Sequence, residues 1–158
     1  MILDEKLEFC DATSVALTAN AAPQNVGDVI DLGSARDIGA GEPLYLVIGV
    51  DTEIITGGSA GTISFLLVSD GTDTIATNGT QTIHFESRPF VTDGTDANDT
   101  ELKAGAYPVI LPLPMEGRPY ERYLAVQVRA VTTNTTAGKI NAFLTHDVSK
   151  FKAYPDAI

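Results

Sequence analysis

Two histidines and one cysteine are the first residues of this chain to consider for catalysis. Imidazole and thiol groups act as general bases and nucleophiles when a second group orients them. His146 precedes Asp147, but adjacent residues of a strand point to opposite faces of a sheet, so the two do not form a dyad. His84 and Cys10 belong to no catalytic motif. The sequence therefore predicts that the chain is not an enzyme and carries no cofactor.

One acidic segment resembles a metal site. Asp93, Asp96, Asn98 and Asp99 place oxygen ligands close together in the sequence, as a calcium site requires. Their spacing does not match an EF-hand loop, and Asp-Gly pairs form ordinary tight turns. We therefore expect a solvated, turn-rich loop here, with a calcium site as the alternative.

The charge of the chain limits its partners. Its 158 residues include 21 acidic and 10 basic side chains, which give a formal net charge of −11. Such a chain repels phosphate backbones and anionic lipid surfaces, so neither nucleic acid nor membrane is an expected partner. The amino terminus does not read as a secretion signal, and no apolar run is long enough to span a bilayer. We expect a single soluble domain that is made in a cytoplasm.

The clearest structural element is a strand near the carboxyl end. Within residues 122–131 the apolar side chains of Leu124, Val126 and Val128 share one face, while Gln127 lies on the solvent side. This alternation is typical of a half-buried strand. Residues 44–50 instead form an almost continuous apolar run, which favours a strand covered on both faces.

Further strands follow from short β-branched runs separated by turn residues. Residues 74–77 and 80–86 flank Asn78-Gly79, which predicts a hairpin. The other predicted strands are residues 26–32, 62–69, 107–114 and 139–145. About eight short strands without helical periodicity are typical of a sandwich or barrel.

We predict an all-β fold, an antiparallel jelly-roll-like sandwich with extended N- and C-terminal arms. An immunoglobulin-like sandwich is the second choice. The predicted organisation is an N-terminal arm over residues 1–22, the sandwich over 23–148, and a C-terminal tail over 149–158.

Both ends of the chain carry more apolar groups than a solvated tail would. These groups either cover the open ends of the sandwich or dock on another subunit. Aromatic and arginine side chains are favoured as interface anchors. The candidate interface residues are Ile2, Leu3, Leu7, Phe9, Arg36, Arg122, Tyr123, Phe151 and Tyr154.

Four segments, Met1–Glu5, Ile30–Tyr45, Glu121–Leu124 and Thr136–Asp147, resemble the capsid cement (decoration) proteins of short-tailed bacteriophages. The resemblance runs over most of the chain. It implies a jelly-roll domain in the virion that binds the exterior of an icosahedral shell. It further implies a dimeric staple, a homo-oligomer across two-fold contacts between major capsid proteins, without catalysis or cofactor.

Two other functional classes are open at this stage. A carbohydrate- or receptor-binding β-sandwich module of a phage particle needs a groove with stacked aromatic side chains or bound calcium. A cupin-like oxygenase needs histidines and a carboxylate clustered on facing strands. The two histidines of this chain are far apart in the sequence, which disfavours the enzyme.

Overall fold

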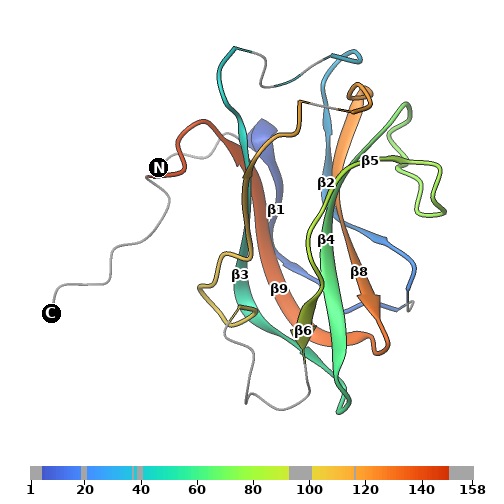
Figure 1. Cartoon of the computed structure of the whole chain (residues 1–158), viewed down its shortest axis with the longest axis vertical. Coiled ribbons are helices and arrows are strands. Elements are labelled where there is room, and N and C mark those ends of the chain that lie inside the picture. Colours follow the sequence, from blue (N-terminus) through green and yellow to red (C-terminus); the bar gives the residue numbers. More distant parts are fainter. Residues whose placement is uncertain are drawn as a thin grey trace, which may run out of the picture.

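The computed structural model describes residues 5–18, 21–36, 38, 41–92, 101–115 and 117–149, which form two antiparallel sheets packed face to face (Figure 1). A short 3-10 helix, η1 (Glu5–Leu7), precedes the first strand. Sheet A contains, in spatial order, β1 (Glu8–Ser14), β9 (Thr135–Thr145), β3 (Tyr45–Thr56) and β7 (Val109–Pro112). Sheet B contains β2 (Gln24–Asp31), β8 (Tyr123–Val131), β4 (Gly61–Asp70) and β5 (Thr82–Glu86), with β6 (Phe90–Thr92) also paired to β4. The predicted all-β sandwich is confirmed.

The strand pairing is that of a jelly roll. β1 pairs with β9, β2 with β8, β3 with β7, and β4 with both β5 and β6. These are the pairs of one long antiparallel ribbon that is folded at the connection between β4 and β5. Rolling that ribbon adds the pairs between β3 and β9 and between β4 and β8. The result is the two-sheet arrangement of a jelly roll, the first of the two predicted topologies.

Alternation along β4 shows how the sequence builds the core. Ile63, Phe65 and Leu67 point between the sheets and are completely buried. Leu66 and Val68 point to the outer face of sheet B, and they are buried as well. Because β4 is covered on both faces, its sequence is almost continuously apolar. β3 shows the same pattern, which confirms the prediction for residues 44–50.

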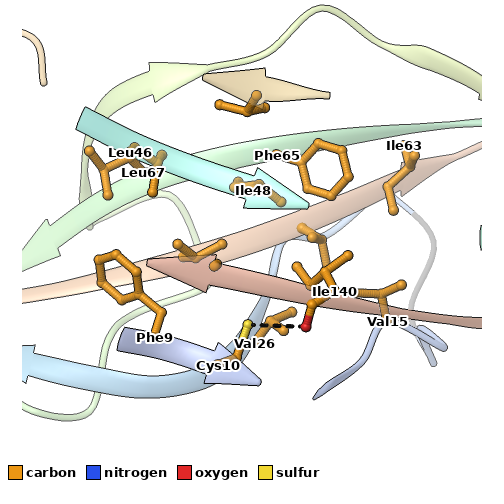
Figure 2. Close-up of a cluster of buried hydrophobic side chains, with 14 of the residues drawn as sticks. Phe9, Cys10, Val15, Val26, Leu46, Ile48, Ile63, Phe65, Leu67 and Ile140 are labelled. Carbon is orange, nitrogen blue, oxygen red and sulfur yellow. Dashed lines mark hydrogen bonds between the residues drawn. The ribbon is translucent and has the colours of Figure 1, made fainter. Parts of the chain in front are cut away.

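Strand β1 belongs to the sandwich, which corrects the prediction of an arm over residues 1–22. Phe9 is completely buried between the sheets, and the Sγ of Cys10 donates to the carbonyl of Ile140 at 3.6 Å (Figure 2). Two register shifts interrupt the pairing of β1 with β9, and Ala12 has a φ of 44°. Bulges of this kind break the alternation of apolar and polar residues by which a strand is read from sequence.

The connection between β4 and β5, residues 71–81, does not contain the predicted hairpin strand over 74–77. It lies against the outer face of sheet B (Figure 1), where the carbonyl of Ile75 accepts a hydrogen bond from Asn25 at 3.0 Å. Gln127 lies under this connection and is completely buried. The prediction that Gln127 is exposed to solvent is therefore wrong, because a segment distant in sequence covers that face.

Candidate interaction surfaces

The two sides of the sandwich differ. On one side β1 and β2 lie together, and Gly27 of β2 closely approaches the backbone of Phe9. On the other side, β7 and the pair β5 and β6 leave an open groove of about 370 Å³ between the sheets, here named the edge groove. Its lining residues are Phe85, Ser87, Arg88, Phe90, Pro108, Val109, Ile110 and Leu111.

Arg88 lies over the aromatic floor of the edge groove. Its guanidinium carbon is 4.3 Å from the centroid of the Phe90 ring, which is a cation–π distance. Phe90 in turn packs against Phe65 of the core, with ring centroids 5.8 Å apart. Arg88 also forms an ion pair with Glu101, and the two side chains are 59% and 51% exposed. Exposed ion pairs contribute little to stability, so a bound partner can displace this one at small cost.

The β7 wall of the edge groove is poorly suited to pairing with another strand. The N–H of Leu113 donates to the carbonyl of Leu44 at 2.8 Å, and hydrogen-bonded positions alternate along an antiparallel pair. The backbone groups of Pro108, Ile110 and Pro112 therefore face away from sheet A. Since proline has no N–H, only Ile110 can donate from this edge, which protects the edge against strand addition.

The opposite wall is interrupted as well. Between β5 and β6, residues 87–89 leave the strand conformation, and the last of them is Pro89. The N–H of Ser87 donates to the carbonyl of Phe65 at 2.9 Å, and the Oγ of Ser87 accepts from the N–H of Phe65 at 3.0 Å. The polar groups of Ser87 are thus satisfied within the sheet, and neither wall presents a continuous row of backbone donors and acceptors.

Several exposed apolar residues belong to the strands and segments that border the edge groove. Within the described ranges, six large hydrophobic residues are exposed, and four of them lie on the strands or segments that border the groove. These four are Ile83, Val91, Tyr107 and Ile110, and the other two are Met115 and Val131. Of these six residues, Ile110 is the one that lines the groove.

Sequence reasoning did not find the edge groove, because none of its lining residues is among the predicted interface residues. Its two walls are distant in sequence and meet only when the ribbon is rolled. The available signal was the pair Pro108 and Pro112. Residues four apart in a strand direct their backbone groups to the same side, and two prolines on one side indicate an unpaired edge.

A polar cluster lies at one end of the sandwich. Ser69 Oγ lies 2.7 Å from His84 Nε2, and the imidazole stacks on the ring of Tyr120 with centroids 3.9 Å apart. A serine paired with a histidine can be a nucleophile and its base. Here Ser69 is completely buried and its Oγ accepts the N–H of Glu121 at 3.1 Å. The Glu121 carboxylate accepts from Thr82 at 2.6 Å, so the cluster braces β4, β5 and the segment before β8.

This brace makes stability depend on pH. Burial lowers the pKa of His84 below 6.5, against the opposing effect of the Glu121 charge. Because the fold favours the neutral imidazole, the stabilisation is fully present above pH 6.5 and declines as the pH falls below that value. We expect the urea midpoint to fall between about pH 7.5 and about pH 5.5 more steeply in the wild type than in His84→Gln. Equal slopes in the wild type and His84→Gln would exclude His84.

The predicted interface residues differ in how far the structure buries them. Leu7 is half-buried against the core, Arg36 is exposed, and Tyr123 is half-buried. Phe9 was wrongly predicted as an interface residue, because the sandwich itself encloses this side chain and leaves none of it accessible. Ile2, Leu3, Phe151 and Tyr154 lie outside the described residues.

Arg122, another predicted anchor, joins the start of β8 to the end of β2. Its Nε and a terminal nitrogen each donate to Asp31 at 2.8 Å, and its guanidinium lies 4.9 Å from the centroid of the Tyr123 ring. These hydrogen bonds, together with one from the N–H of Gly33, lower the pKa of Asp31 from 3.8 to about 2. The pair therefore stabilises the fold above about pH 4 and loses this contribution as the pH falls toward 2.

We expect Arg122→Gln to raise the pKa of Asp31 most of the way back to 3.8, because the main hydrogen-bond donors are removed. Carboxyl-detected NMR titration measures this directly. Arg36→Gln is the matched control, because Arg122 and Gly33, and not Arg36, are the groups that lower the pKa of Asp31, and it should leave the Asp31 titration unchanged. An unshifted Asp31 in Arg122→Gln would contradict the assignment.

No metal site is evident in the part of the chain that the structure describes, where no three His, Cys, Asp or Glu side chains are placed to hold an ion. A hollow of about 410 Å³ beside β1 carries the carboxylates of Glu5, Glu8, Asp11 and Asp28. The predicted acidic loop at residues 93–99 lies outside the described residues.

None of the described helices has the length and hydropathy of a membrane span.

Comparison with known proteins identifies one family. A family model described as Bbp16 matches residues 9–144, which cover the jelly roll from β1 to β9. No match is found among curated proteins.

Proposed function

The chain belongs to the Bbp16 family, a phage-associated family, and on that basis we propose that it binds the outside of an icosahedral phage capsid as a structural protein of the virion. In this role it joins neighbouring major capsid proteins and stabilises the shell against the pressure of packaged DNA. The observation that carries the proposal is the family match over residues 9–144. The resemblance of four sequence segments to cement proteins supports the same role.

The stabilisation follows from mass action. A protein that binds the assembled shell but not its separate subunits favours the assembled state. At a free concentration of 100 times Kd, each occupied site contributes about 2.7 kcal/mol. Many copies on one particle therefore strengthen the contacts between capsid subunits without any chemistry.

We propose that the active form is a dimer. A two-fold dimer presents the same surface to two neighbouring capsid subunits, so the second attachment becomes an intramolecular event. Each attachment can then be modest in affinity while the dimer remains bound.

The electrostatics of the chain are compatible with a position on the shell exterior. A net charge of −11 repels the phosphates of packaged DNA and keeps a highly abundant protein soluble. The exposed apolar side chains beside the edge groove supply the kind of surface that a protein partner covers.

Purified virions test the proposal. We expect the chain in near-stoichiometric ratio to the major capsid protein, measured by quantitative mass spectrometry of density-purified particles. Particles from a phage that lacks the gene should release DNA at a lower temperature, and adding back the purified protein should restore the wild-type value. Absence of the chain from intact virions would disprove the role.

The predicted interface residues Ile2 and Leu3 can be tested without changing any residue of β1. Deletion into β1 would remove Phe9, which the fold needs, so the test replaces only Ile2 and Leu3 with serine. If these residues dock on a neighbouring subunit, the double variant binds gene-deleted particles more weakly at an unchanged unfolding temperature. Unchanged binding would remove them from the mechanism.

A further inference from the structure

We infer that the edge groove receives an extended apolar segment of the shell protein, held by side-chain contacts and not by addition of a strand to either sheet. This inference rests on the proposed function and adds which surface of the jelly roll is used and how it recognises its partner. The surface is the open side between β7 and the pair β5 and β6.

The walls of the edge groove determine the kind of contact. Phe90 and Val109 are buried at its floor, whereas Phe85 and Leu111 are half-buried and Ile110 is 39% exposed at its rim, so these three residues supply its accessible apolar surface. An apolar side chain that enters the groove removes this surface from water. At about 25 cal/mol per Å² of apolar area, such burial is the main favourable term available here.

Backbone pairing is excluded as the main contact. A strand added to β7 would meet one N–H donor, that of Ile110, flanked by two prolines. A strand added to the other wall would meet the break at residues 87–89, where the N–H of Ser87 is already bonded to Phe65. The same features prevent two copies of this chain from pairing edge to edge, so the groove can stay open and apolar without causing self-assembly.

Charge determines the occupant. The chain has 21 acidic and 10 basic side chains and a net charge of −11. A second copy carries the same negative charge and is a less favourable occupant of the groove than a neutral or basic protein, so the proposed dimer forms through another surface. A neutral or basic partner is attracted. The occupant that fits is therefore an apolar segment with basic or uncharged flanks on a different protein, and in the virion that protein is the shell subunit.

A matched pair of variants tests the surface. Ile110 and Val131 are exposed strand residues with accessibilities of 39% and 41%, but Val131 lies on the outer face of sheet B, away from the groove lining. Shells from a phage that lacks the gene are mixed with full-length wild type, Ile110→Asp or Val131→Asp and sedimented. We expect Ile110→Asp to bind at least about tenfold more weakly, the loss typical of an interface anchor, and Val131→Asp to bind like the wild type.

The outcomes separate the two proposals. If the wild type binds and Ile110→Asp binds equally well, the groove is not the docking surface, although the capsid role stands. If the wild type itself does not bind shells, the proposed function fails. Equal unfolding temperatures of the two variants establish that any difference arises at the surface. If Ile110→Asp is unstable, Ile110→Ser replaces it with the same expected order of binding.

Cross-linking identifies the occupant. Cys10 is buried, and burial raises its pKa to about 11, so a maleimide at neutral pH modifies only a cysteine introduced at the surface. Ile110→Cys is labelled with a photoreactive maleimide, bound to shells and irradiated. A product with the mass of this chain plus the shell subunit supports the inference. A product of two copies of this chain, or no product from particles that hold the labelled protein, overturns it.

Discussion

Gly27→Ala is expected to destabilise the fold by about 3–5 kcal/mol, because the new side chain has no space and the backbone conformation is unfavourable. Gly27 has a φ of 74°, in the left-handed region that L-residues avoid. A Cβ at this position would lie 2.5 Å from the Cβ of Cys10 and closer still to the carbonyl oxygen of Phe9. These neighbours belong to β1, so the clash separates the two edge strands that close one side of the sandwich.

The control is Gly33→Ala. Gly33 has nearly the same φ, 76°, but the nearest atom to its built Cβ is a guanidinium nitrogen of Arg36 at an ordinary 3.5 Å. This variant therefore reports the backbone cost alone, about 1–2 kcal/mol. Urea unfolding of both variants and the wild type gives the difference. An equal loss of unfolding free energy in Gly27→Ala and Gly33→Ala would show that the contact between β1 and β2 is not tight.

Gln127→Met is expected to lower the free energy of unfolding by about 2–4 kcal/mol, because it leaves buried polar groups without partners. Gln127 donates to Asn25 at 2.7 Å and to the carbonyl of Ala76 at 2.8 Å, and it accepts from Gln81 at 3.1 Å. Methionine has a similar shape but offers none of these bonds. Since they attach the 71–81 connection to sheet B, the connection should also detach.

Two measurements check this prediction. Urea unfolding gives the stability, and thermolysin, which cleaves before apolar residues, reports whether Ile75 has become accessible. Leu66→Met is the matched control. Leu66 of β4 pairs directly with Gln127 of β8, and its substitution removes no side-chain hydrogen bond. Leu66→Met should lower the free energy of unfolding by less than about 1.5 kcal/mol, and Ile75 should remain protected from thermolysin. A Gln127→Met protein as stable and as protease-resistant as the control would contradict the role assigned to the hydrogen bonds.

The fold was predictable wherever alternation is regular. Leu124, Val126 and Val128 were placed on one face from their spacing, and all three are buried between the sheets. β1 was not predictable, because its bulges hide the alternation that would place Phe9 in the core. The 74–77 segment was misread since its β-branched residues favour a strand, whereas side chains from two other strands hold it against sheet B.

The candidate site was less accessible to sequence reasoning than the fold. The residue types of Arg36, Arg122 and Tyr123 predict an interface role, because arginine and aromatic side chains are favoured there. Arg122 is engaged with Asp31 within the chain. Nothing in the sequence distinguishes Ile110, because one isoleucine among prolines is typical of any strand. Its exposure depends on being in the last strand of sheet A, and that position results from the rolled topology.

The sequence by itself determined that the fold is an all-β sandwich, because alternation and turn residues are local properties. It also carried the segments that resemble cement proteins. The tertiary structure decided which apolar residues are core and which are surface. Phe9 is enclosed, Gln127 is covered, and Ile110 is exposed. Alternation assigns a residue to one of two faces, but whether that face meets solvent depends on segments far away in the sequence that fold over it.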